Sequence, residues 1–163
     1  MSYLVRKISI GNWNVDNPNF EDVSADAITK DLKTEGNINS WWKIDNLDDL
    51  EMMALSIASC FELKGNVGVV AIPFETIDEK LDIQQSAGKT AIIEYQSAHY
   101  DITNLNYRTL GILASLILKQ LNNTRNYHLL TFKKIIEKIK KIIQDGNLTI
   151  NRDLLGNAIK ESV

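Results

Sequence analysis

The chain has 163 residues, of which 44% are hydrophobic and 24% charged, and its formal net charge is −3. This length suits one domain with a core of its own, so residues 1–163 are expected to form a single globular domain. Cys60 is the only cysteine, which excludes a disulfide framework, and no run approaches the about 20 apolar residues of a membrane-spanning helix. Without a secretory signal at its start, the chain is predicted to be cytoplasmic.

The charge is unevenly distributed along the chain. Between Asn12 and Glu62, eleven Asp and Glu residues stand against three Lys, a balance of −8. Between Lys119 and Ile142, seven Lys and Arg residues stand against one Glu, a balance of +6. Such a separation of charge bears on association with partners rather than on the fold.

Strands are expected where β-branched and aromatic residues gather, and helices where apolar residues recur every three or four positions. In the first part of the chain these patterns predict a strand at Tyr3–Ile10, an Asn-rich loop at Gly11–Asp22 and a short helix at Ala25–Leu32. A second strand at Trp41–Ile44 is expected to precede a helix over about Asn46–Leu63.

The middle of the chain holds the most apolar strand candidate. Val67–Phe74 is almost continuously apolar, which is typical of a strand that is covered on both faces. Leu81 and Ile83 alternate with charged residues, which favours a short strand within Thr76–Ser86. Thr90–Tyr95 is predicted to be the strand that follows.

The last third is predicted to be helical. Asn104–Gln120 is apolar almost all round, as a buried helix is. Thr131 can cap a basic amphipathic helix at Phe132–Gln144, and a short terminal helix is expected over about Asn151–Lys160. Together these elements predict an α+β fold, a single domain with a central mixed or antiparallel sheet of about four or five strands and helices packed on it.

One grouping of a histidine with carboxylates is a weak candidate for a catalytic site. In a regular strand His99 and Asp101 would share one face, whereas Glu94 would point to the other. A carboxylate beside an imidazole raises its basicity, as a small hydrolase or transferase would require, with Glu94 or Tyr100 in support. The same pair can instead make a structural hydrogen bond at a strand-to-helix junction. Two histidines and one cysteine are poor material for zinc, so neither metal nor cofactor is expected.

The acidic residues of the first third exceed what helix capping needs, and some of them flank aromatic residues in the predicted loop. An acidic rim around aromatic anchors suits a basic protein partner, because complementary charge speeds encounter and aromatic side chains supply affinity. Solubility alone would also explain the excess of acidic residues. The residues expected to contact a partner are Trp13, Asp16, Phe20, Glu21, Asp22 and Trp42.

The helix at Phe132–Gln144 combines a stripe of isoleucines with five lysines between Lys133 and Lys141. Such a helix can follow nucleic-acid phosphates or lie on an anionic membrane. The simpler interpretation is a surface helix that packs its isoleucines on the core and leaves its lysines in water, where the acidic half of the chain attracts them.

The favoured hypothesis is a non-catalytic bacterial protein that binds a basic partner, as immunity proteins and antitoxins bind nuclease toxins. An enzyme using His99 and Asp101 is the first alternative, and nucleic-acid binding through Lys133–Lys141 is the second. No association with a membrane is expected. The first two hypotheses differ in surface shape, because an enzyme needs a concave pocket at His99 and a binding protein needs a flat acidic patch.

Overall fold

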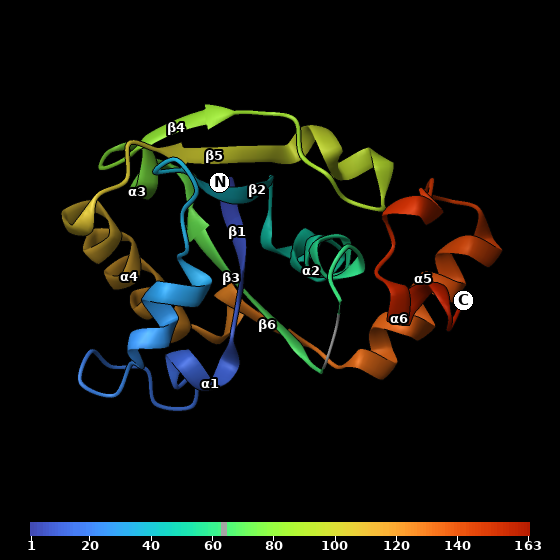
Figure 1. Cartoon of the computed structure of the whole chain (residues 1–163), viewed down its shortest axis with the longest axis horizontal. Helices are drawn as coiled ribbons and strands as arrows, with labels where there is room; N and C mark the ends of the chain where they lie inside the picture. The colour runs from blue at the N-terminus through green and yellow to red at the C-terminus, as the bar shows by residue number, and fades with distance from the viewer. Residues whose placement is uncertain (63–64) are drawn as a thin grey trace.

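Figure 1 shows the computed structural model of the chain, which describes residues 1–62 and 65–163. Its centre is one sheet in the order β4-β5-β2-β1-β3-β6, with every neighbouring pair antiparallel. The α+β prediction is confirmed, although the strands within the described residues slightly exceed the four or five expected. They are β1 (Tyr3–Ile8), β2 (Asn39–Ile44), β3 (Val67–Pro73), β4 (Asp82–Gln85), β5 (His99–Thr103) and β6 (Tyr127–Leu130).

Helices cover both faces of the sheet (Figure 1). One face packs Leu4 and Ile8 of the first strand under the 107–121 and 27–31 helices, and the other packs Val5 under the 50–59 and 132–145 helices. The first strand reaches both cores because successive side chains of a strand point to opposite faces. The helices of the described ranges are α1 (Ile10–Trp13), η1 (Ala27–Asp31), η2 (Leu47–Asp49), α2 (Leu50–Ser59), α3 (Phe74–Asp78), η3 (Ile93–Ala98), α4 (Tyr107–Leu121), η4 (Thr124–Asn126), α5 (Phe132–Asp145), η5 (Arg152–Leu154) and α6 (Asn157–Lys160).

Strand β3 confirms the prediction made from its apolar run. It lies between β1 and β6, and every residue from Val67 to Ile72 is buried. Helices cover both of its faces, so neither set of alternating side chains meets water, and the sequence shows no polar alternation there. Pro73, which lacks an N–H for the ladder, is the last residue of the strand.

The strand predicted at Thr90–Tyr95 is wrong. Thr90 is buried, and its hydroxyl lies 2.6 Å from Ser56 Oγ and donates to Ser56 O of α2 at 2.9 Å. Ile92 makes one isolated bridge to Ile150, and η3 follows directly. The apolar residues of this segment therefore pack against α2 and the C-terminal part of the chain, and the strand begins only at His99.

Helix predictions are confirmed with shifted ends. Helix α5 matches its predicted range to one residue, and α2 ends at Ser59, whereas the predicted end at Leu63 lies outside the described residues. Helix α4 begins at Tyr107 instead of Asn104, because the Asn106 side chain caps it. A strip of α4 through positions 111, 115 and 119 is exposed, so the expectation that this helix is buried all round is wrong.

Two further predicted elements are divided in the structure. The segment Thr76–Ser86 contains the expected short strand, β4, but the end of helix α3 precedes it. The predicted terminal helix over about Asn151–Lys160 is split into η5 and α6. A bilayer-spanning helix needs about 20 apolar residues, and no helix within residues 1–62 and 65–163 combines that length with that hydropathy.

Candidate functional site

Trp13 belongs to the core and precedes the acidic loop in the chain. Its side chain is fully buried, and its indole Nε1 donates to Asp31 Oδ2 at 2.8 Å. The same carboxylate accepts from the backbone N and the hydroxyl of Ser9, both at 2.7 Å. The expectation that Trp13 is an exposed anchor for a partner is therefore wrong. Its indole packs in the core, where the N–H needs the acceptor that Asp31 provides.

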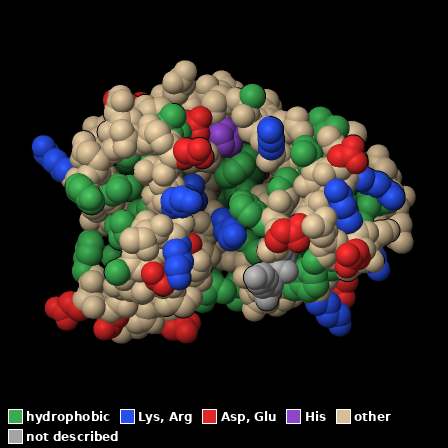
Figure 2. Space-filling model, in the orientation of Figure 1, with side chains coloured by type: hydrophobic (Ala, Val, Ile, Leu, Met, Phe, Trp, Pro, Cys, Tyr) green, Lys and Arg blue, Asp and Glu red, His purple; other side chains and the backbone are tan. Residues whose placement is uncertain are grey.

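The loop of residues 16–22 carries the exposed part of the predicted partner-binding surface. Phe20 has 66% of its surface exposed, and Asp16, Glu21 and Asp22 are exposed beside it. Asn19 Oδ1 accepts from the backbone N of Glu21 at 2.9 Å and of Asp22 at 3.0 Å, which fixes the turn that carries the phenyl ring. Figure 2 shows acidic side chains along the lower left rim, over this loop. The loop thus offers an aromatic ring between carboxylates on an ordered backbone.

Trp42 lies apart from this loop, in the wall of a cleft. It is half-buried on β2, and its ring meets the His99 ring in a T-shaped contact, with 4.8 Å between centroids and 76° between planes. The residues proposed from the sequence as one partner surface therefore occupy three places. These are the core for Trp13, the loop for Asp16, Phe20, Glu21 and Asp22, and the cleft for Trp42.

Strand β5 brings His99 and Asp101 together, as period-two alternation predicts. His99 Nε2 lies 4.0 Å from Asp101 Oδ1, which is too long for a hydrogen bond. The other ring nitrogen, Nδ1, lies 2.7 Å from Ser86 Oγ, and Asp101 Oδ1 accepts from Ser40 Oγ at 3.2 Å. Glu94 is not part of this group, because its carboxylate accepts from the backbone N of Thr149 at 2.8 Å.

The surroundings of His99 favour a structural role over catalysis. Only 7% of His99 is exposed, and Gly88 lies so close that a Cβ there would sit 2.5 Å from His99 Cβ. A serine hydrogen-bonded to histidine is the pair that nucleophilic catalysis uses, but substrate must also reach it. The two best-formed clefts of the described surface are not lined by His99 or Ser86.

Burial lowers the pKa of His99, and Asp101 only partly opposes this effect. The pKa of His128 is also lowered by burial, against the opposing charge of Glu51. An unfolded histidine titrates near 6.5, so below that pH the unfolded chain binds protons that the folded chain does not. Stability from these neutral histidines is therefore complete above pH 6.5 and is lost as the pH falls through their folded pKa values.

We expect the urea midpoint to fall when the pH is lowered from about 7.5 to about 5.5, the window set by the unfolded histidine pKa. The His99→Gln variant should show a shallower decrease, because one of the two responding groups has been removed. An unchanged pH dependence in His99→Gln would show that His99 titrates alike in the folded and unfolded chains.

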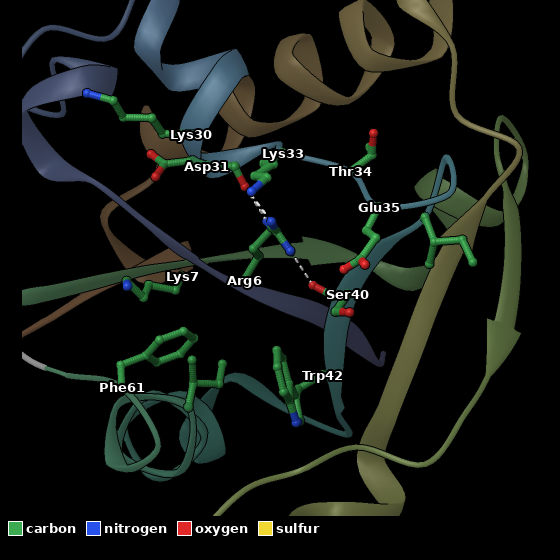
Figure 3. A pocket seen from close by; sticks show the side chains of 12 residues that line it. Arg6, Lys7, Lys30, Asp31, Lys33, Thr34, Glu35, Ser40, Trp42 and Phe61 are labelled. Carbon is green, nitrogen blue, oxygen red and sulfur yellow. Dashed lines mark hydrogen bonds between the residues drawn. The ribbon is translucent and has the colours of Figure 1, made fainter. Parts of the chain in front are cut away.

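A cleft of about 460 Å³ opens where β1 and β2 separate (Figure 3). The two strands pair only from Tyr3–Ile44 to Val5–Trp42, although β1 continues to Ile8 and β2 begins at Asn39. Arg6 bridges this gap. Its guanidinium donates to the backbone carbonyls of Asp31, in η1, and Ser40, in β2. Because burial removes water from Arg6, its pKa falls to about 10 despite the nearby charge of Asp31.

The cleft carries more positive than negative charge. Arg6, Lys7, Lys30 and Lys33 line it, against the carboxylates of Asp31 and Glu35. Lys30 pairs with Asp26 at 2.6 Å, whereas Arg6 and Lys7 form no ion pair with any described residue. Lys7 Nζ lies 4.1 Å from the centroid of the Phe61 ring, and burial lowers its pKa. Figure 2 shows the cleft as a hollow with cationic side chains on one side and hydrophobic ones on the other.

Helix α5 follows the simpler interpretation of its pattern. Ile135, Ile139 and Ile142 are buried against the core. Lys138 pairs at 3.1 Å with Glu51 of the acidic segment, as the attraction between the two halves predicts, and Lys133 pairs with Glu137 at 3.9 Å. The packed isoleucines and these two ion pairs are those of a surface helix that packs on the core, and Lys134, Lys140 and Lys141 are exposed.

The cleft was missed by reasoning from the sequence, although one signal was present. Arg6 and Lys7 are consecutive charged residues inside the otherwise apolar strand β1, at the centre of the sheet. Charged residues are rarely buried without a partner, so such a pair indicates either an internal ion pair or a polar cavity.

Within residues 1–62 and 65–163, no group of three or more His, Cys, Asp or Glu side chains is placed to hold a metal ion. No family model, curated protein or solved structure shows significant similarity to this chain, so its function must be argued from these sites.

Proposed function

We propose that the protein is a non-catalytic binding domain whose acidic loop, residues 16–22, occupies the basic surface of a protein partner. Immunity proteins and antitoxins that neutralise cationic nuclease toxins work in this way, and the proposed partner is of that class. Nuclease clefts are positively charged because they bind nucleic-acid phosphates, so a carboxylate-rich loop is complementary to them.

The observation that supports this proposal is the exposure of Phe20 on an ordered, acidic turn. Large aromatic side chains dominate binding energy when a partner buries them, and holding them rigid beforehand reduces the entropy lost on binding. The two hydrogen bonds that Asn19 accepts from Glu21 and Asp22 supply that rigidity. Asp16, Glu21 and Asp22 make no ion pair within the described part of the chain, so their charges are available to a partner.

The enzyme and nucleic-acid alternatives have weaker support. His99 and Ser86 line neither cleft, and Gly88 covers the imidazole. On α5, Lys138 and Lys133 already pair with carboxylates. The enzyme alternative would need access to His99 that the described surface does not offer, whereas the exposed Lys134, Lys140 and Lys141 leave the nucleic-acid alternative open to a binding test.

The test compares loop variants in binding to a basic partner. Candidate partners are the product of the adjacent reading frame and basic proteins that the parent chain captures from its native host, each then purified. We expect Phe20→Ala to weaken binding by about 30-fold, the effect of a typical hot spot. The triple variant Asp16→Lys, Glu21→Lys, Asp22→Lys should slow association strongly, and more so at low salt. Titration calorimetry and surface binding kinetics measure both effects.

A matched control reverses three exposed carboxylates elsewhere, with the triple variant Glu75→Lys, Asp78→Lys, Glu79→Lys at α3. This control changes the net charge by the same amount and should retain most of the affinity. Loss of binding in the control alone, or unchanged affinity in both loop variants, would contradict the proposed surface.

A further inference from the structure

The cleft between β1 and β2 is lined by more cations than carboxylates, and Arg6 at its centre forms no ion pair within the described residues. The Arg6 guanidinium has five N–H donors, and its bonds within the described residues go to the neutral carbonyls of Asp31 and Ser40. The Asp31 carboxylate accepts from Ser9 and Trp13 and offsets only part of the positive charge of Arg6 and Lys7. Lys7 and Lys33 add two more cations at the same cleft. A bound anion would compensate this charge in a place where water screens it weakly.

The two walls of the cleft differ in chemistry (Figure 3). Lys30, Asp31 and Lys33 form one wall, and the aromatic rings of Trp42 and Phe61 lie on the other, with Arg6 and Lys7 between them. Aromatic side chains accept flat rings by stacking, and arginine and lysine accept phosphate. The cleft therefore combines the two surfaces that a ring-bearing phosphate needs.

The ends of the cleft are also different. Figure 3 shows Lys7 and Lys30 at one end and Thr34 and Glu35 at the other. The Glu35 carboxylate would repel an anion, but it accepts hydrogen bonds from hydroxyl or amino groups. A ligand is therefore oriented with its anionic group toward Lys7 and its hydrogen-bond donors toward Glu35.

We propose that this cleft binds a nucleoside monophosphate, with its phosphate at Arg6, Lys7 and Lys33, its base against Trp42, and an amino or hydroxyl group at Glu35. The volume of about 460 Å³ lies in the range of small-molecule sites. In this arrangement the positive charge binds the phosphate, and the aromatic wall contacts the base. The site is independent of the loop that carries Phe20, so either proposal can fail without the other.

Titration calorimetry of the full chain with AMP, GMP, CMP and UMP tests the proposal, with adenosine and inorganic phosphate as the two halves of one ligand. We expect at least one nucleotide to bind at least tenfold more tightly than inorganic phosphate. For AMP, the affinity should also exceed that for adenosine, because the cleft contacts both halves. Equal affinities for phosphate and all four nucleotides would overturn the proposal.

Two variants test which side chains bind the phosphate and which bind the nucleoside. Lys7→Met should weaken nucleotide binding at least tenfold and leave adenosine binding unchanged, whereas Trp42→Leu should weaken adenosine and nucleotide but not phosphate. The exposed Lys80, near α3, provides the control Lys80→Met, which should bind as the parent does. Thermal unfolding of each variant separates loss of binding from loss of folding. Unchanged nucleotide affinity in a folded Lys7→Met variant would place the ligand elsewhere.

Discussion

Replacing Trp13 with alanine should lower the free energy of unfolding by about 3–5 kcal/mol, the usual result of removing a fully buried tryptophan. Phe20→Ala should change it by less than about 0.5 kcal/mol, because Phe20 is largely exposed. The two aromatic residues lie seven positions apart in one predicted loop, and the structure gives them opposite roles. Urea denaturation monitored by circular dichroism measures both values. A mild effect of Trp13→Ala would contradict the burial of this side chain.

Trp13→Phe separates the ring from its hydrogen bond. Phenylalanine keeps much of the buried ring but cannot donate to Asp31, which leaves part of a buried carboxylate without its partner. We expect an intermediate loss of about 1–3 kcal/mol, smaller than that of Trp13→Ala. Equal losses in the two variants would show that packing contributes little at this position.

Arg6→Met should lower the free energy of unfolding by about 2–3 kcal/mol. Methionine retains the apolar stem but leaves the carbonyls of Asp31 and Ser40 without their donor, and each unsatisfied buried group costs about 1–3 kcal/mol. Part of this loss is offset, because burying the arginine is itself unfavourable, as its pKa of about 10 indicates. Urea denaturation again measures the change.

Two variants control this experiment. Arg6→Lys keeps the charge but presents one ammonium instead of a planar fork, so it should recover only part of the loss. Lys7→Met changes the neighbouring residue, which makes no hydrogen bond or ion pair within the described residues. It should lower the free energy of unfolding by less than about 1 kcal/mol. A parent-like stability in Arg6→Met would mean that the two carbonyls find other donors.

Arg6 contributes both to the stability of the fold and to the cleft. It lies just beyond the last paired residues of β1 and β2, where the two strands separate and the cleft begins. Binding of an anion should therefore stabilise the fold, because a ligand that binds only the folded chain raises the free energy of unfolding with the logarithm of its concentration.

Features that depend on one strand or one helix could be predicted from the sequence. The apolar run of β3, the isoleucine stripe of α5 and the shared face of His99 and Asp101 all follow from the period of one strand or helix. Each depends only on residues that are a few positions apart in the chain, so the spacing of residue types in the sequence is enough to predict it. The α+β class follows from the order of these elements.

The site itself was decided by contacts between distant segments. Asp31, eighteen residues later in the chain, provides the acceptor that the buried Trp13 indole needs, and Thr90 lies outside the sheet with its hydroxyl bound to Ser56 of α2. The cleft exists because β1 and β2 pair for three residues and then separate, which places Arg6 and Lys7 at a gap. Where a ladder ends depends on the packing of helices on both faces of the sheet, and no local period encodes it. The sequence by itself thus determined most of the elements and their charges, while the tertiary structure decided which side chains from distant segments meet.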